Sequence, residues 1–470
     1  MTTPFDFLEM DFDRIHRASQ EELVTAFKDN DATWESAFKA ASFYSSGRAC
    51  IKGNGGGGES ARFHREPQRD GSFNICYWIK VAGEEREWVV RFPKPYAPLA
   101  ILQTKVRSEA ATLQYLRRHT QVPVPRLIGY SDGIPPFLII EHVEGWRLNI
   151  IWGRRDAGLV QNAILKSLAK IQHELLSHPF DKIGMLEKSD SDEIIGPLSI
   201  DALEHCRDGV IPNLPSPFET ASEYYEHKLE VAVRRLRIQR NSIASIPDGQ
   251  RRFLVPHVVR EYMRREGNSK NDAGPFYLVH PDLHGSNVII DTATFTIASI
   301  LDWEGACIVP IEDACALPRC LHNHLVDDLL PNSEKWQTFN HRAKTYAKFF
   351  SDIARSHQTE FAVSESITTK LFFTWAIADV RFIDPLIWQH IAPFTYPELR
   401  RDYDRIYAQN DYEHTSFDEL EDFISSVINK FVENQVKVNL LRSELDQDVG
   451  KKMKDLKEYL KELEGSRKTE

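Results

Sequence analysis

The 470-residue sequence has only six cysteines, and their spacing indicates neither a zinc ribbon nor a disulfide framework. We therefore expect reduced, mostly buried thiols. No stretch approaches the roughly 18 consecutive apolar residues of a membrane span. The first thirty residues are rich in acidic side chains, unlike a transit peptide, and they contain no apolar run of the secretory type. These absences predict a soluble, cytoplasmic protein that does not bind a membrane.

An excess of positive charge is also missing. Lys and Arg total 58 against 69 Asp and Glu, so the formal net charge is -11. Such a balance argues against an extended phosphate-binding surface, and nucleic acid is not an expected partner. The hydrophobic content of 42% is that of a globular protein with a large core. On the usual domain scale the length predicts two or three domains, or one large two-lobed unit.

Residues 1–60 are predicted to form an N-terminal helical arm that ends in a glycine-rich hinge. Helical patterns cover residues 21–28 and 34–43, and five glycines fall within residues 53–58. This run formally satisfies GxGxxG and also mimics the spacing of GxxxxGK(S/T), but Glu59 stands where the second pattern needs a phosphate-binding lysine. We interpret the run as a flexible loop, because polyglycine meets such patterns by composition alone.

After residue 60 the sequence pattern changes from helical to strand-like. Residues 73–81 and 87–92 are rich in β-branched and aromatic side chains and are separated by a turn, which predicts antiparallel strands. A helix is expected over residues 103–118, and a further strand over 137–141. Together these elements predict a sheet-rich lobe over residues 61–141.

Residues 142–435 are predicted to be mainly helical, with a few short strands. An α+β fold class follows, with a small antiparallel-sheet lobe before a larger helical lobe. Residues 436–470 are predicted to form a charged helix. Its narrow apolar stripe indicates either pairing in a homo-oligomer or with a partner helix through residues 441–470, or packing on the body of the protein. The helices of the larger lobe are expected at 162–176, 221–240 and 333–356, and its strands at 276–279, 288–290 and 297–301.

The most informative segment is a polar loop between two of these strands. It contains His280, Asp282 and Asn287, and Asp302 follows fifteen residues after Asn287. Phosphoryl transfer requires a carboxylate near the acceptor hydroxyl, and hard oxygen ligands that hold magnesium against the nucleotide phosphates. Asp282, Asn287 and Asp302 supply these groups in the spacing of a kinase catalytic loop and metal aspartate. The alternative is a polar hairpin with an Asx-turn.

On these motifs, residues 62–400 resemble the aminoglycoside phosphotransferase and choline kinase family, in particular its eukaryotic branch. The resemblance implies a two-lobed protein-kinase-like fold that uses ATP and magnesium. It also implies that Asp282 is the catalytic base or hydroxyl-orienting group, with His280 beside it in the catalytic loop. Asn287 and Asp302 then bind the metal, since residues 301–304 resemble the family's Asp-Trp-Glu metal motif.

Elements of the first lobe fit the same resemblance. Gly71, Ser72 and Asn74 lie in a turn that resembles the family's nucleotide loop, in which backbone amides approach the phosphates. Arg91 occupies the strand position where protein kinases have a nucleotide-binding lysine, and Glu109 is placed to pair with it. An arginine clamps phosphate through a planar fork of donors, and a lysine acts as a point charge. A surface arginine is the alternative.

Residues 122–125, followed by residues 137–145, resemble the family's lead into the hinge between lobes. There, backbone groups near Glu141 and Val143 are expected to bond adenine, and an edge strand and turn is the alternative. Aromatic side chains between residues 372 and 388 fit ordinary core packing better than a box for a quaternary amine. Acidic residues near 312 and 327 receive no role, so the acceptor's identity stays open.

The sequence therefore predicts an ATP- and magnesium-dependent phosphotransferase that transfers the γ-phosphoryl group to a small-molecule acceptor, most simply a hydroxyl. The same chemistry could instead activate a carboxylate. A function of another class is a catalytically silent nucleotide-binding scaffold that uses the C-terminal helix to assemble partners. The motif residues do not separate a hydroxyl from a carboxylate acceptor.

Overall fold

The computed structural model describes two compact units. The larger unit contains the described residues between 49 and 224 and between 271 and 366, and the smaller contains those between 225 and 266 and from 368 onward. Of the predicted arm only residues 49–50 are described, and they form a short strand rather than a helix. Its two helical patterns and the glycine run lie outside the described residues. The predicted domain limits at 60, 141 and 435 stay predictions. The described residues are 49–50, 69–70, 74–81, 87–94, 99–154, 157–188, 193–198, 216–238, 243, 246–266, 271–322, 333–366, 368–378, 386, 391, 447–455 and 457–458.

An antiparallel sheet forms the first part of the larger unit. Its strand order is β1-β3-β4-β6-β5, with β2 also paired to β3. Apolar side chains of the central strands, among them Ile75, Val90 and Ile139, are completely buried. The strands are β1 Ala49–Cys50, β2 Arg69–Asp70, β3 Asn74–Val81, β4 Trp88–Pro93, β5 Leu127–Ser131 and β6 Phe137–Glu141.

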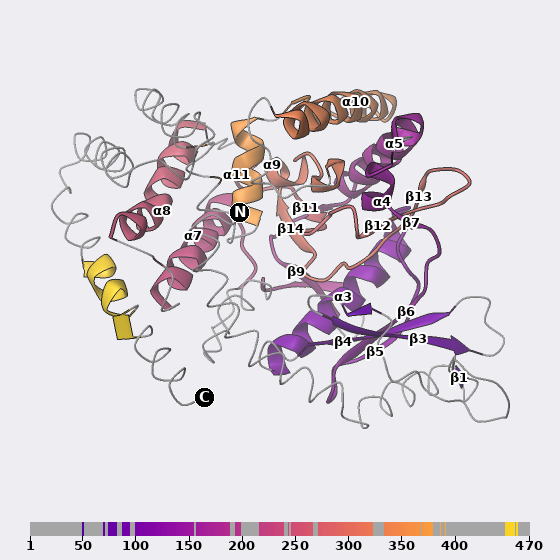
Figure 1. Cartoon of the computed structure of the whole chain (residues 1–470), viewed down its shortest axis with the longest axis horizontal. Coiled ribbons are helices and arrows are strands. Elements are labelled where there is room, and N and C mark those ends of the chain that lie inside the picture. The colour runs from indigo at the N-terminus through magenta and orange to yellow at the C-terminus, as the bar shows by residue number, and fades with distance from the viewer. Residues whose placement is uncertain are drawn as a thin grey trace. The chain divides into compact units, whose positions relative to one another are not determined.

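Helix α3, Leu99–His119, packs against β5 and β6 of this sheet (Figure 1). The helix begins four residues earlier than the sequence pattern predicts. Ile101 and Leu102 lie in this additional turn and are buried, so the apolar face of α3 is longer than expected. The opposite end carries Arg117, Arg118 and His119, whose charge favours a helix C-terminus.

The remainder of the larger unit is mainly helical, which confirms the predicted α+β class. Helix α10 packs against α5. Helix α5 also contacts two short sheets, of order β14-β11-β8 and β13-β12-β7, through β11 and β13. The elements are β7 Trp146–Arg147, α4 Leu148–Trp152, α5 Ala157–Leu176, β8 Pro179–Phe180, β9 Met185–Lys188, β10 Glu193–Gly196, β11 Phe276–Val279, β12 Val288–Ile290, β13 Ile297–Ile300, β14 Cys307–Pro310, α9 Ile311–Ala314, η3 Arg319–Leu321 and α10 Glu334–Ser356.

Two glycines allow the loop before β12 and the segment after β6 to approach their neighbours closely. Gly145 has a φ of 147°, and a Cβ there would lie 2.6 Å from the carbonyl oxygen of Ile290. A Cβ on Gly285 would lie 2.9 Å from the backbone nitrogen of Asn149, at the start of α4. Larger residues at either position would therefore displace the hairpin formed by β12 and β13.

The smaller unit contains most of α7, Ala221–Ile238, together with α8, Ile246–Glu266, and α11, Thr369–Ala378. Helical residues of the C-terminal segment pack on this unit, since Val449 is buried and Asp448 pairs with Arg237 at 2.8 Å. This contact favours packing on the body, and pairing of residues 441–470 with another chain stays a prediction. No helix in the described part of the chain is long and apolar enough to cross a bilayer.

Candidate active site

The loop between β11 and β12 is held in one conformation by its own hydrogen bonds. The Asn287 side-chain amide donates to the backbone oxygen of Asp282 at 3.0 Å, and the Asn287 amide donates to the His284 oxygen at 3.0 Å. The Leu301 amide in turn donates to the Asn287 oxygen at 2.8 Å. The structure therefore joins the predicted catalytic loop directly to the segment that carries Asp302.

His280 is buried and uses both ring nitrogens inside this loop. Its Nδ1 accepts from the Asp282 amide at 3.2 Å, so the ring proton lies on Nε2, which donates to the Leu301 oxygen at 2.9 Å. Burial lowers the pKa of His280, although the hydrogen bond to Leu301 acts in the opposite direction. The lowered pKa favours the neutral ring. Such an arrangement suits positioning of Asp282 better than proton transfer to a substrate.

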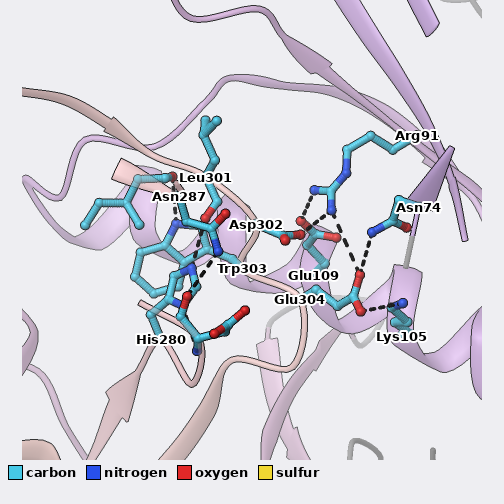
Figure 2. Close-up of polar contacts among 12 residues, drawn as sticks. Asn74, Arg91, Lys105, Glu109, His280, Asn287, Leu301, Asp302, Trp303 and Glu304 are labelled. Atoms are coloured by element: carbon cyan, nitrogen blue, oxygen red, sulfur yellow. Dashed lines mark hydrogen bonds and ion pairs between the residues drawn. The ribbon is translucent and has the colours of Figure 1, made fainter. Parts of the chain in front are cut away.

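Asp302 and Glu304 flank a buried tryptophan. Trp303 is 1% exposed and donates its indole N–H to the Ile300 oxygen at 3.0 Å. Asp302 adopts a left-handed backbone conformation, with φ of 64°, which is uncommon outside glycine. Anchoring of Trp303 in the core leaves both carboxylates directed at the same group of charged side chains (Figure 2).

Arg91 lies at the centre of that group. Its Nη1 contacts the Glu109 carboxylate at 2.5 Å, and its Nη2 hydrogen bonds to Asp302 and lies 3.9 Å from Glu304. Burial alone would lower the pKa of Arg91, but these acidic neighbours raise it well above its ordinary value. The expected contact between Arg91 and Glu109 is thus present, while a role for either residue in nucleotide binding stays a prediction.

Glu304 connects this group to two further elements. Its carboxylate accepts from the Asn74 side chain of β3 at 2.8 Å and forms an ion pair with Lys105 of α3. Asn74 therefore contacts Glu304, and a role for Asn74 in nucleotide binding stays a prediction. The sequence interpretation assigned no role to Lys105 or Glu304, although Lys105 lies one helical turn before Glu109 and so on the same face of α3.

The group contains three carboxylates and two cations. Burial, together with the nearby carboxylates of Asp302 and Glu304, raises the pKa of Glu109 to about 7 against the opposing effect of Arg91. Burial also raises the pKa of Asp302, but Arg91 and His280 outweigh this and hold it below its ordinary value. Glu109 is therefore only partly ionised at neutral pH, so the charges of this group are nearly balanced.

The Lys105–Glu304 pair is expected to couple α3 to the Asp302 segment. Lys105→Met leaves Glu304 without that partner, and breaking a buried pair typically costs about 3–5 kcal/mol. The double variant Lys105→Met/Glu304→Gln should lose clearly less than the sum of the two single variants. Urea unfolding of all four proteins measures this coupling.

The exposed pair Lys454–Glu458 provides the control. Its side chains are 77% and 56% exposed, so Lys454→Met should change the free energy of unfolding by less than about 1 kcal/mol. Strictly additive losses in the Lys105 and Glu304 cycle would show that the two side chains contribute independently.

The predicted adenine-binding segment follows β6. The Glu141 amide donates to the Arg126 oxygen at 2.9 Å, and the His142 amide donates to the Glu87 oxygen at 2.8 Å. Val143 follows in the half-buried loop before β7. The amides of Glu141 and His142 are thus already bonded to residues that immediately precede β5 and β4, and they are not available to bond a base in this structure. Gly71 and Ser72, the other predicted nucleotide contacts, lie outside the described residues.

Asp282 is half exposed and has two basic neighbours that the sequence interpretation did not identify. His284 Nε2 lies 3.4 Å from Oδ2, and Arg319 Nη1 lies 3.8 Å from Oδ1. Burial opposes ionisation of Asp282, but His284 and Arg319 outweigh it and lower its pKa to about 2. His284 belongs to the catalytic loop and could have been noticed there, whereas Arg319 lies on η3 with no local motif around it.

The family profile described as the phosphotransferase enzyme family matches residues 74–314, just over half of the chain. The chain belongs to this family. The matched range includes strands β3 to β6 of the sheet, the predicted catalytic loop and both carboxylates of the Asp302 segment. Arg319 lies just beyond its end.

Curated relatives of this phosphotransferase-family chain include fungal proteins. A subtelomeric hrmA-associated cluster protein of Aspergillus fumigatus is 24% identical in an alignment 311 positions long, which covers 54% of this chain and 60% of the relative. The mitochondrial altered inheritance of mitochondria protein 9 of Debaryomyces hansenii is 26% identical over 132 residues, 26% of this chain and 21% of that protein. The chain thus spans less than two thirds of the length of these relatives.

Solved structures similar to this chain include two small-molecule kinases. Wild-type aminoglycoside 2'-phosphotransferase-IIIa in its GDP complex is 17% identical, with a TM-score of 0.38, covering 77% of this chain and 92% of that one. The ethanolamine kinase of Plasmodium vivax is 12% identical, with a TM-score of 0.39, covering 76% and 79%.

The residues predicted to bind magnesium fit a hard cation. Asn287 uses its amide nitrogen within the loop, which leaves its side-chain oxygen for a ligand role. Asp302 is 38% exposed, so its carboxylate can be reached. Within the described ranges no group of three or more His, Cys, Asp or Glu side chains is arranged to hold a metal. Two protein ligands are nevertheless typical of magnesium that is also held by phosphates and water.

Proposed function

We propose that this phosphotransferase-family chain transfers the γ-phosphoryl group of ATP to the hydroxyl of a small molecule, with magnesium as cofactor. The observation that carries the proposal is the hydrogen-bonded connection between the Asp282 loop and the Asp302 segment. It is made by Asn287 to Asp282 at 3.0 Å and by Leu301 to Asn287 at 2.8 Å. One rigid unit therefore presents a hydroxyl-orienting carboxylate and two oxygen ligands, which is the set that phosphoryl transfer requires.

Asp282 is suited to orient the acceptor rather than to act as a strong base. A carboxylate whose pKa is about 2 stays ionised at neutral pH and accepts a hydrogen bond from the attacking hydroxyl. Its proton affinity is low, so full proton removal before attack is unfavourable. Positioning and charge stabilisation then supply most of the catalysis, as a loose phosphoryl-transfer transition state permits.

Asn287 and Asp302 would hold the magnesium ion, which neutralises charge on the phosphates when bound. In the structure Asp302 is paired with Arg91. We infer that this contact must loosen for Asp302 to bind the metal, and that Arg91 can then direct a guanidinium donor to a phosphate while Glu109 holds its other side.

Phosphorus NMR of the chain with ATP, magnesium and pooled acceptors tests the proposal. Transfer produces a new phosphomonoester resonance together with ADP. Thermal unfolding should also rise with ATP and magnesium, since a ligand that binds only the folded state raises stability. Absence of both the resonance and the thermal shift would exclude the proposed activity. An acid-labile acyl phosphate in place of an ester would indicate a carboxylate acceptor.

A nucleotide-binding scaffold without transferase activity is the second candidate. The observation that favours it is the pairing of Asp302 with Arg91, because an aspartate held by an arginine is a poorer metal ligand. In that case ATP would stabilise the protein equally with and without magnesium, and no phosphorylated product would form. The C-terminal residues 441–470 would then be the candidate partner-binding segment.

A further inference from the structure

The hydroxyl-orienting carboxylate faces basic side chains on both of its oxygens. His284 lies near Oδ2 and Arg319 near Oδ1, at 3.4 Å and 3.8 Å, and these side chains come from different elements. Both reach solvent, with 42% and 21% of their side-chain surfaces exposed. A substrate hydroxyl bonded to Asp282 places its neighbouring atoms within a few ångströms of both groups.

We propose that the acceptor is an anion, a hydroxyl compound bearing a carboxylate or phosphate close to the reacting hydroxyl, and that Arg319 with His284 binds that group. The inference rests on the proposed function and adds the charge class of the substrate. Arginine suits this role because its planar fork of donors matches both carboxylate and phosphate. Arg319 is then the specificity-determining residue of the acceptor site.

A cationic acceptor fits the same place poorly. An ammonium group near its own hydroxyl would lie close to the Arg319 guanidinium, and like charges at short separation weaken binding by roughly tenfold or more. The described aromatic side chains of the 372–388 segment pack in a core and do not form an open box. Phe372, Phe373 and Trp375 of α11 are 2%, 6% and 5% exposed, and Phe373 packs against Tyr225 and Tyr262.

Glu312 and Asp313 of α9 are the acidic side chains nearest to Arg319 in the described sequence. Glu312 of α9 accepts a hydrogen bond from Asn271 at 3.1 Å, so its charge is directed at that amide. The groups that face the Asp282 carboxylate are His284 at Oδ2 and Arg319 at Oδ1. Both oxygens of Asp282 therefore have a basic side chain beside them.

Arg319 could instead stabilise the phosphoryl group in transit, and the two roles have different kinetic effects. A residue that binds the acceptor controls the KM for that acceptor, whereas one that acts only in the transition state lowers kcat for every acceptor. Arg319→Gln should therefore raise the KM for anionic acceptors at least tenfold and change kcat by less than about threefold. Arg319→Glu should reverse the charge preference toward amino alcohols.

The experiment uses the 470-residue chain with three acceptor pools: hydroxy acids, sugar phosphates, and amino alcohols with aminoglycosides. Product formation by phosphorus NMR is followed by KM and kcat for the best acceptor with wild type, Arg319→Gln and Arg319→Glu. Turnover of either anionic pool supports the inference, and the pool that reacts distinguishes carboxylate from phosphate. Arg355→Gln is the matched control, because Arg355 is 77% exposed and pairs with Asp352 on its own helix.

Failure of the inference and failure of the proposed function give different results. If wild type shows neither an ATP-dependent thermal shift nor phosphoryl transfer, the proposed function is wrong. Transfer to amino alcohols with a KM that Arg319→Gln leaves unchanged would overturn only the anionic acceptor, as would hydrolysis of ATP with no transfer to an anionic pool. An equal fall in kcat for all acceptors would assign Arg319 to the phosphoryl group and also overturn the inference.

Discussion

Asp282→Asn is expected to reduce phosphoryl transfer by roughly 10²–10⁴-fold, the range typical when positioned proton-transfer help is removed. Asparagine keeps the size of the side chain but loses the negative charge that orients the attacking hydroxyl. The affinity for ATP with magnesium should persist, because Asp282 directs its side chain to His284 and Arg319 rather than to Arg91 and Glu304. Calorimetry alongside turnover measures both properties.

Asp302→Asn is the comparison that separates orientation from metal binding. The substitution removes a hard anionic ligand and should weaken nucleotide binding in the presence of magnesium, with Asn287→Ala giving a milder form of the same defect. Equal nucleotide affinities in the Asp282 and Asp302 variants would contradict these separate roles.

The pH dependence of turnover offers a further check on Asp282. Its pKa is lowered to about 2, so the ionised form is present at higher pH and is lost only as pH falls through that value. Titration of Asp282 should therefore cause no loss of kcat between about pH 5 and 8. An acid limb in this window that disappears in Asp282→Asn would contradict the assignment.

Trp303→Ala is expected to lower the free energy of unfolding by about 3–5 kcal/mol, the usual cost of truncating a fully buried large aromatic side chain. Trp303 is 1% exposed, contacts the His280 ring at a centroid distance of 4.9 Å and donates to Ile300. Its loss leaves a cavity and removes the anchor of both Asp302 and Glu304. Urea unfolding measures the stability, and ATP affinity with magnesium should fall in parallel.

Trp146→Ala is the matched control for that truncation. Trp146 of β7 is 41% exposed and its ring is covered by Arg154 at 4.7 Å, so the same change in side chain should cost less than about 1 kcal/mol. A loss at Trp303 no larger than that at Trp146 would show that the Asp302 segment does not depend on its tryptophan anchor.

The elements with strong local patterns were predictable from the sequence. The expected strands over 137–141 and 276–279 coincide with β6 and β11, because each is a short apolar run between turn residues. Helix α8 was missed. Its apolar and charged residues are spread around the helix and Pro256 lies inside it, so no periodic face marks it in the sequence.

The α+β class could be predicted from the sequence alone, and so could the candidate catalytic-loop group, because His280, Asp282, Asn287 and Asp302 lie within 23 residues and match the spacing of a kinase catalytic loop. Which distant charges meet these residues follows from the tertiary fold. Glu304 bonds to Asn74 across 230 residues and Asp302 to Arg91 across 211, while Arg319 reaches Asp282 from another element. Periodicity shows which face of a strand or helix is buried, but it does not specify which other face it meets. Charge pairing across the fold depends on that packing.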